Sequence, residues 1–183
     1  VYSVSSRMTR IVKICLFLAK KDMGKNLNFQ RIPPIELIHS VTEQLNLIVR
    51  EKEQRLDVYC EENLPEIYGD RDRLEQLFLN VIGNAIKYTP EHGIITVYVG
   101  RQKDGVSIKV TDTGIGIPEK DLERIFERFY RVDKARSRQL GGTGLGLSIA
   151  KEIAESHGGT IQAKSKPQQG TEIIVFLPVN DKN

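Results

Sequence analysis

The segment RDRLEQLFLNVIGNAIKYTP, residues 71–90, constrains the fold more than any other part of the chain. Placed at about 100° per residue, its apolar side chains cover more than half of a helix circumference, so this helix must be largely buried. The apolar residues are Leu74, Leu77, Phe78, Leu79, Val81, Ile82, Ala85 and Ile86. The polar stripe that remains consists of Arg73, Gln76, Asn80, Asn84 and Lys87. This stripe faces either a cavity or bulk water, and the helix alone does not decide between them.

The residue types in the stripe suit a particular chemistry. Asparagine is a mediocre helix former, and a solvated stripe would sooner carry Glu or Lys. Asn80 and Asn84 lie one turn apart, and Lys87 follows about one turn later. Amide oxygens and an ammonium group along one line suit an oxygen-preferring cation such as Mg²⁺ and phosphate oxygens.

Helical and strand patterns alternate along the chain. The apolar spacing predicts helices at residues 3–22, 34–52, 71–87, near 119–125 and at 144–156. Strand patterns cover residues 55–61 and two hairpins, at 95–112 and 159–178. Asp70 is placed to cap the helix that starts at residue 71. We therefore expect an α+β sandwich in which helices pack on one face of one mixed sheet.

The composition argues against several classes of protein. Of the 183 residues, 39% are hydrophobic and 28% are charged, which predicts a packed core rather than disorder. A net charge of +3 gives no general case for nucleic acid or an anionic membrane. Cys15 and Cys60 lie far apart, which argues against a zinc site or a disulfide framework and fits a reducing cytosol. The longest apolar run, residues 14–19, is far too short to span a bilayer.

A second stretch of interest is VTDTGIGIPE, residues 110–119. A predicted strand ends at Asp112, and Gly114 and Gly116 follow at once. An Asp at a strand end, beside glycines that admit a flat ligand, can accept a hydrogen bond from the exocyclic amine of adenine. The alternative is a plain turn capped by Asp, and the residues alone favour that alternative.

The stretch LGGTGLGLS, residues 140–148, is rich in glycine and runs directly into a helix. It matches neither the Walker loop, which requires a Lys, nor the GxGxxG dinucleotide fingerprint. A glycine-rich loop at a helix N-terminus still offers free backbone N–H groups and the positive end of the dipole to a phosphate. A flexible linker is the alternative, but Leu145 and Leu147 fit the amphipathic helix and favour phosphate binding.

The segment FERFYRVDKARSRQLGG, residues 126–142, mixes aromatic residues with arginine and lysine. This composition is compatible with single-stranded nucleic acid, but Glu123, Glu127 and Asp133 dilute the positive charge. A mobile lid that holds a cation over a triphosphate explains the same residues. A solvated loop with an aromatic anchor remains a competing interpretation for each individual Arg.

Taken in order, these segments resemble the boxes of one family. NVIGNAIKYTP, DTGIGIP, FERFYR and GGTGLGLSIA resemble the N, G1, F and G2 boxes of sensor histidine kinases, and Gly170-Thr171 resembles the last glycine box. The match covers roughly residues 33–178. It implies the two-layer α/β sandwich of the Bergerat (GHKL) type, preceded by a helix, which gyrase, MutL-type repair proteins and heat-shock chaperones share. Among these kinases the chain looks most similar to membrane-bound sensors of phosphate, respiration or cell-wall signals in Gram-positive bacteria.

The resemblance implies ATP and Mg²⁺ as cofactors and assigns roles by position. Asn84 would ligate Mg²⁺ with support from Asn80, Lys87 would reach a phosphate, and Tyr88 would line the nucleotide. Asp112 would accept the adenine amine. Asn80, Lys87 and Arg131 would serve catalysis. The remaining nucleotide-binding positions would be Gly114, Gly116, Ile117, Phe126, Arg128, Arg131, Gly142, Thr143, Gly144, Leu145, Gly146, Leu147 and Thr171.

One position separates kinases from ATPases on this fold. In ATPases of the superfamily, a Glu one turn before the metal-binding Asn activates water, and here that position is Asn80. A neutral amide cannot act as a general base near pH 7. We therefore expect slow hydrolysis, with the γ-phosphoryl group kept for another nucleophile.

In the family that nucleophile is a histidine on a dimerisation helix. None of His39, His92 and His157 has the family's acceptor context, and each is better interpreted as a structural or surface residue. The chain starts without methionine, and residues 5–25 resemble the end of the second dimerisation helix. We expect part of a dimerisation and phosphoacceptor helix in residues 1–25 and the ATP-binding catalytic domain in residues 26–183. The acceptor histidine would then lie upstream of residue 1, unless the chain is an orphan module with a divergent acceptor.

The expected function is that of a protein-histidine kinase catalytic domain in a two-component pathway. Its partners would be the dimerisation domain of the same kinase and a downstream response regulator, with no nucleic acid. The full-length protein would be a homodimeric sensor anchored in a bacterial inner membrane, with this domain in the cytoplasm. Two alternatives remain, a clamp-type ATPase of the same superfamily and a serine kinase of the anti-sigma type.

Overall fold

A computed structural model describes residues 27–133 and 143–179. The expected helix at residues 3–22, the boundary at residues 25 and 26, and Gly142 lie outside the described residues. The elements follow the chain as β1 (Phe29–Ile32), α2 (Pro34–Glu51), β2 (Arg55–Cys60), β3 (Ile67–Asp70), α3 (Arg71–Tyr88), β4 (Ile94–Gln102), β5 (Gly105–Asp112), the 3₁₀ turns η1 (Glu119–Asp121) and η2 (Arg124–Phe126), α5 (Gly146–Ser156), β6 (Thr160–Ser165) and β7 (Thr171–Pro178).

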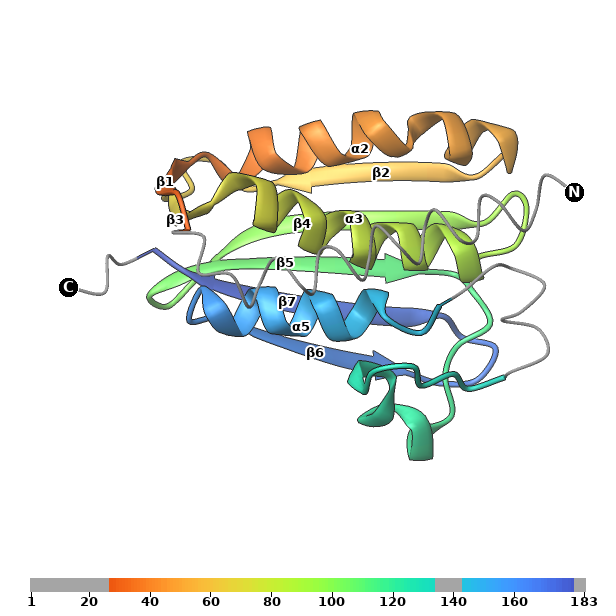
Figure 1. The fold of residues 1–183 in the computed structure, drawn as a ribbon. Coiled ribbons are helices and arrows are strands. Elements are labelled where there is room, and N and C mark those ends of the chain that lie inside the picture. Colours follow the sequence, from red (N-terminus) through yellow and green to blue (C-terminus); the bar gives the residue numbers. More distant parts are fainter. Residues whose placement is uncertain (1–26, 134–142, 180–183) are drawn as a thin grey trace, which may run out of the picture.

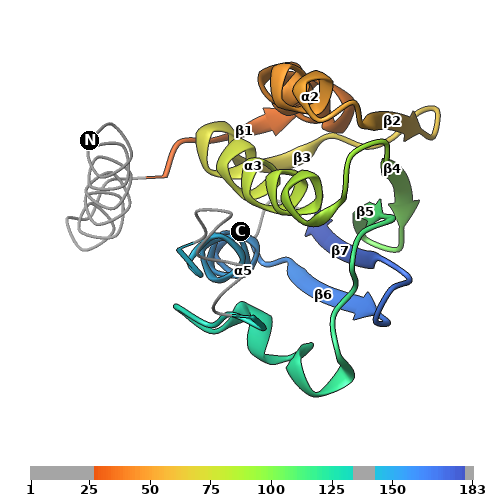
Figure 2. The ribbon, with the colours of Figure 1, turned by 90° about the vertical axis from the view of Figure 1, so that its right-hand side faces the viewer.

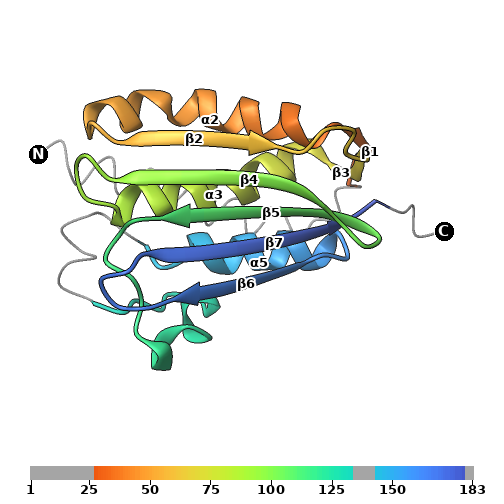
Figure 3. The ribbon, with the colours of Figure 1, turned by 180° about the vertical axis from the view of Figure 1, so that it is seen from behind.

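The main sheet has five strands in the order β2-β4-β5-β7-β6. β2 runs parallel to β4 and the other neighbours are antiparallel, so the sheet is mixed, as the sequence predicts. The three long helices α2, α3 and α5 lie side by side on one face of this sheet (Figures 1 and 2). Seen from behind, the strands stand in front of the helices (Figure 3). The predicted two-layer α+β sandwich is confirmed.

A second, two-stranded sheet corrects the expectation of a single sheet. β1 and β3 pair antiparallel, with Phe29 opposite Asp70 and Ile32 opposite Ile67. The sequence predicts neither strand, because a strand of four residues has too few positions to show an alternating pattern. The antiparallel pairing sets Ile32, just before α2, opposite Ile67 at the start of β3, and sets Phe29 opposite Asp70, the N-cap of α3.

Two helices also differ from expectation. The last helix begins at Gly146 rather than residue 144, because Gly144 adopts a φ of +73°, which is outside the helical region. The short helix expected near 119–125 is divided into the two separate turns η1 and η2.

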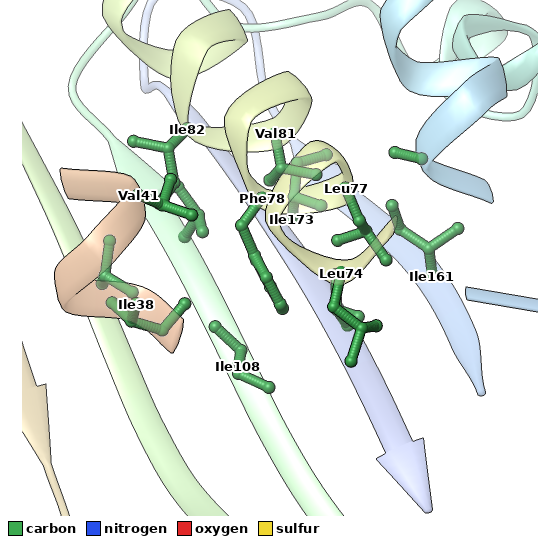
Figure 4. Packing of buried hydrophobic residues seen from close by; sticks show 14 of the residues in the cluster. Ile38, Val41, Leu74, Leu77, Phe78, Val81, Ile82, Ile108, Ile161 and Ile173 are labelled. Atoms are coloured by element: carbon green, nitrogen blue, oxygen red, sulfur yellow. The ribbon is translucent and has the colours of Figure 1, made fainter. Parts of the chain in front are cut away.

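The core forms between α3 and the sheet. Seven α3 residues are no more than 5% exposed, namely Leu74, Leu77, Phe78, Val81, Ile82, Ala85 and Ile86. Figure 4 shows Phe78 among the side chains of α3, α2 and the sheet. Burial of a side chain of this size stabilises the fold by roughly 1.5–3 kcal/mol, so α3 is fixed firmly to the layer beneath it. Leu79, which was expected in the core, is only partly buried.

None of the described helices combines the length and the apolar composition that crossing a bilayer requires.

Candidate functional site

The polar stripe of α3 forms one wall of a cavity of about 780 Å³. Gln76, Asn80, Asn84 and Lys87 all line it, whereas Arg73 does not. The opposite walls come from the end of β5, the loop after it, the segment 130–133, and the residues that lead into α5. Of the two interpretations of the stripe, the structure supports the cavity.

Asp112 lies in the cavity wall at the last position of β5 and is only 8% exposed. Its Oδ1 accepts hydrogen bonds from the backbone N–H groups of Gly114 (2.8 Å) and Thr171 (3.2 Å). Burial raises the pKa of this carboxyl, and the two hydrogen bonds offset part of that rise. The described residues donate no hydrogen bond to Oδ2, so one oxygen remains for a ligand.

Gly114 allows the Asp112 loop to approach the end of α3 closely. A Cβ at this position would lie 2.6 Å from the Tyr88 carbonyl oxygen and 2.7 Å from Asp112 Oδ1. The amide of Ile115 donates to the same Tyr88 oxygen at 3.4 Å. A side chain here would separate the Asp112 wall of the cavity from the Tyr88 wall.

Asn80 carries an unusual amide. Its Oδ1 accepts a hydrogen bond from Gln76 Nε2 at 3.1 Å, while its buried Nδ2 has no partner among the described residues. An orphaned buried donor is costly, and such groups are often explained by a ligand. A half-turn of the amide alone would place Nδ2 against Gln76 Nε2, donor to donor, so the orphaned donor is not relieved by that turn.

Asn80 and Asn84 line the cavity one helical turn apart, and carboxamide oxygens are among the ligands that Mg²⁺ takes beside water and phosphate. Within the described ranges, no cluster of three His, Cys, Asp or Glu side chains could hold a metal. An all-protein cage is therefore absent from that part of the chain, and two carboxamides are consistent with the few protein ligands that Mg²⁺ usually takes in a nucleotide site.

The residues leading into α5 lie opposite Asn80. An ideal Cβ built on Gly146, the first residue of α5, would be 3.7 Å from Asn80 Oδ1. Leu145 at the N-cap makes no side-chain capping hydrogen bond. The N-terminus of α5 thus presents backbone N–H groups at the cavity, as the glycine-rich sequence predicts.

A network of polar and aromatic contacts supports the first residues of the predicted lid. The Tyr130 hydroxyl donates to Asp121 Oδ1 at 2.5 Å, and the Arg124 guanidinium lies 4.2 Å from the centre of the Tyr130 ring. The hydrogen bond to Asp121 raises the pKa of Tyr130. Phe129 N donates to Gly144 O at 2.8 Å, which ties this segment to the start of α5.

Most of the predicted site residues meet at the cavity. Its wall includes Asn80, Asn84, Lys87, Tyr88, Asp112, Gly116, Ile117, Arg131, Thr143, Gly144, Gly146, Leu147 and Thr171. Gly114 lies just behind the wall, in the Asp112 turn.

Three predicted binding residues do not line the cavity. Phe126 packs against the core, with the Lys151 ammonium 6.0 Å from its ring centre. Arg128 forms an ion pair with Glu152 of α5. Leu145 is buried in the core. These contacts fix the cavity walls from outside.

The sequence interpretation missed several lining residues. Tyr130 belongs to the aromatic residues of the F-like box, to which the resemblance assigns no binding role, yet it lines the cavity beside Arg131. Leu45, Ile48 and Lys52 of the α2 region also reach the cavity, and no local sequence pattern marks them.

The three histidines stand apart from the cavity. His39 is exposed, and His92 is exposed beside Glu53 with Nδ1 3.3 Å from the carboxylate. His157 is buried at the end of α5. None of them lines the cavity wall as the structure describes it.

Comparisons with known proteins agree with this geometry. Residues 69–181 match the family described as histidine kinase-, DNA gyrase B- and HSP90-like ATPases. The sensor histidine kinase WalK of Bacillus subtilis (strain 168) is 42% identical over 97% of this chain, and the sensor histidine kinase YkoH of the same strain is 38% identical over 96%. The chain spans 30% of that WalK and 37% of YkoH.

Solved structures show the same arrangement. The catalytic domain of the histidine kinase ThkA superposes with a TM-score of 0.74 at 29% identity, covering 84% of this chain and 97% of that domain. ThkA in complex with the response regulator TrrA gives a TM-score of 0.79 at 25% identity, covering 96% of this chain and 49% of that one.

Proposed function

The chain belongs to the family of histidine kinase-, DNA gyrase B- and HSP90-like ATPases, and we propose that it binds Mg·ATP and phosphorylates a histidine on a dimerisation domain. The observation that carries this proposal is the neutral Asn80 at the cavity wall, one turn before Asn84. The only carboxylates in the described wall are Asp112 and Asp133. Neither is a Glu one turn before Asn84, the position from which ATPases of the superfamily activate water, because Asn80 occupies that position.

Asp112 recognises the base in this proposal. Its Oδ2 accepts a hydrogen bond from the exocyclic amine of adenine, while Oδ1 keeps the turn in place. Gly114 and Gly116 let the chain pack closely around this carboxylate, because a Cβ on Gly114 would meet Tyr88 O and one on Gly116 would meet Lys166 O. The apolar lining of Val110, Ile117 and Ile173 excludes water around the base.

The other end of the cavity holds the phosphates. Lys87 and Arg131 bring positive charge, and the N–H groups at the start of α5 add the positive end of a helix dipole. Asn84, with Asn80, would hold Mg²⁺, which neutralises phosphate charge when bound.

In the chemical step, this domain mainly positions the reacting groups and does not itself form a covalent bond to the phosphoryl group. A ring nitrogen of the acceptor imidazole forms a bond to the γ-phosphorus as the bond to the β-γ bridging oxygen breaks, and ADP leaves with that oxygen. Lys87 and Arg131 stabilise the charge that develops on the transferring group. The amide at Asn80 leaves water without a general base, so the phosphoryl group reaches the imidazole instead.

We extend the proposal to the whole protein. The relatives named as sensor histidine kinases, and the ThkA structure solved with the response regulator TrrA, support a response regulator as downstream partner. By the same likeness we propose a homodimeric sensor, anchored in a bacterial inner membrane, with this domain on the cytoplasmic side.

A mixing experiment tests the central proposal. The chain is incubated with Mg²⁺ and γ-labelled ATP, alone and with a separately purified dimerisation domain that carries the acceptor histidine. We expect label on that domain only, labile in acid and stable in alkali, and no label when its histidine is replaced by alanine. Acid-stable label on the isolated chain, or rapid release of inorganic phosphate without any acceptor, would contradict the proposal.

A further inference from the structure

The C-terminal end of α3 is capped by side chains from outside the helix. The last carbonyl groups of any α-helix lack partners within the helix. Here the Lys52 ammonium donates to the carbonyl oxygens of Ile86 at 2.5 Å and Thr89 at 2.8 Å, with a longer contact of 3.4 Å to Lys87 O. This arrangement uses the several N–H donors of an ammonium group on one cluster of carbonyls.

Gln54 adds a second set of hydrogen bonds to the same cluster. Its Nε2 lies 3.0 Å from Ile86 O, 2.7 Å from Thr89 O and 3.2 Å from Pro90 O. Gln54 is only 8% exposed, so these hydrogen bonds are shielded from water. The segment between α2 and β2 therefore holds the end of α3 from a distance of more than thirty residues along the chain.

The positive charge of Lys52 is favourable at the C-terminal end of α3. A cation at a helix C-terminus interacts favourably with the negative end of the dipole. Burial lowers the pKa of Lys52, and the nearby Glu91 carboxylate offsets part of that effect. The contacts with the carbonyl oxygens of Ile86, Lys87 and Thr89 hold the ammonium at the end of α3 despite this desolvation cost.

The capped turn forms one end of the wall that α3 contributes to the cavity. Lys87 and Tyr88 are the last two residues of the helix, and both line the wall. The Tyr88 carbonyl also accepts from Ile115 N, in the loop that follows Asp112. A shift of this turn would move the Lys87 ammonium and disturb the base pocket together.

We propose that Lys52 and Gln54 are positioning residues, which act on Mg·ATP through Lys87 and Tyr88 by fixing the last turn of α3. The inference rests on the proposed function, because it gives that turn its role in nucleotide binding. Lys52 also lines the cavity, so a direct contact between its ammonium and a phosphate is the competing explanation. The two explanations differ in whether the effect of Lys52 depends on Lys87.

A double-mutant cycle separates them. Mg·ATP affinity is measured by calorimetry for the unaltered chain, Lys52→Met, Lys87→Met and the double variant, with thermal unfolding recorded for each. We expect Lys52→Met to weaken binding about tenfold, which is the scale of one lost charge-assisted hydrogen bond. In the Lys87→Met background the same change should cost less than about threefold, because the residue it positions is gone.

Three further variants complete the test. Lys52→Arg, which keeps the charge and donors, should recover most of the affinity, and Lys109→Met on an exposed position of β5 should leave it unchanged. If Lys52→Met fails to fold, Gln54→Met replaces it in the cycle. Equal losses in both backgrounds, or no loss from Lys52→Met, would overturn the positioning role alone. An unchanged affinity in Lys87→Met would overturn the proposed phosphate site as well.

Discussion

Two aspartates close strands at opposite ends of α3, and they use their carboxylates differently. Asp70 ends β3, where Oδ1 accepts from Arg73 N at 3.1 Å and Oδ2 accepts from Asn28 N at 3.0 Å. Asp112 ends β5, where Oδ1 alone accepts both of its backbone hydrogen bonds. One carboxylate is fully used in holding the fold, and the other keeps an oxygen toward the cavity.

The comparison shows how one local signal serves two purposes. In both places an Asp at the end of a strand accepts backbone N–H groups that the turn would leave unpaired. Asp70 is half-buried and fixes the start of α3, whereas Asp112 is buried with a raised pKa and an unused oxygen. We infer that Asp70 contributes to stability, and that Asp112 contributes to recognition at some expense of stability.

The largest expected effect comes from Asp112→Asn. The amide keeps an oxygen for Gly114 and Thr171 but replaces Oδ2 with an N–H donor, which faces the amine of adenine donor to donor. We expect ATP affinity to fall by roughly ten- to a hundredfold, equivalent to about 1.5–3 kcal/mol for a hydrogen bond to a charged group. Isothermal titration with ATP measures this. An unchanged affinity would place the adenine elsewhere.

The same variant tests whether the buried Asp112 carboxylate lowers the stability of the folded chain. Because the pKa of Asp112 is raised in the folded state, the folded chain holds this proton more tightly than the unfolded chain. The unaltered chain therefore loses stability as pH rises from the ordinary Asp value near 4 through the raised value. In denaturant unfolding, we expect the stability of Asp112→Asn to show no such loss. If the stabilities of the variant and the unaltered chain change in parallel with pH, burial of Asp112 is not the cause of the pH dependence.

The two ends of α3 also show which features of the fold can be predicted from the sequence and which cannot. The cap at Asp70, the buried face of α3 and its polar stripe depend on residues a few positions apart, so periodicity and capping rules predicted them correctly. The cap at the other end uses Lys52 and Gln54, which no local rule connects to Thr89.

The β1–β3 pairing was missed for the same reason. Phe29 and Asp70 are neighbours only after the chain has folded, and each strand is too short to identify by itself. In the site, the Asn pair and Asp112 were predicted because each lies in a recognisable box. The alternative of a plain turn for Asp112 is supported in part, since Oδ1 does cap a turn, and adenine recognition stays a prediction.

Asp70→Ala should produce the second largest effect, on stability alone. The change removes the N-cap of α3 and the link to Asn28, so we expect a loss of roughly 0.5–2 kcal/mol in the free energy of unfolding. ATP affinity of the folded variant should stay within about twofold, because Asp70 does not line the cavity. Asp70→Asn, which retains a capping oxygen, is the matched control and should recover most of the stability. If the folded Asp70→Ala variant clearly loses ATP affinity, Asp70 also contributes to binding, and the two aspartates do not separate stability from recognition.

The smallest effect is a pH dependence at the Asp70 end. The Asp70 N–H donates to His157 Nε2 at 3.0 Å, and His157 Nδ1 lies 2.8 Å from Ile153 O. This pattern requires the neutral imidazole with its proton on Nδ1, since Nε2 must accept. Burial lowers the pKa of His157, while the Ile153 carbonyl and the Asp70 charge partly offset the shift.

The sign of this dependence follows from the lowered pKa. The unfolded chain binds a proton at His157 more readily, so stability is complete above the ordinary value near 6.5 and falls as pH decreases toward the lowered value. Denaturant unfolding between about pH 5 and 7.5 measures it, with His92→Gln at an exposed histidine as the control. His157→Gln should flatten the curve in this window while His92→Gln leaves it in place. If both variants keep the slope, the acid sensitivity arises elsewhere, and Asp70 holds the start of α3 without help from the imidazole.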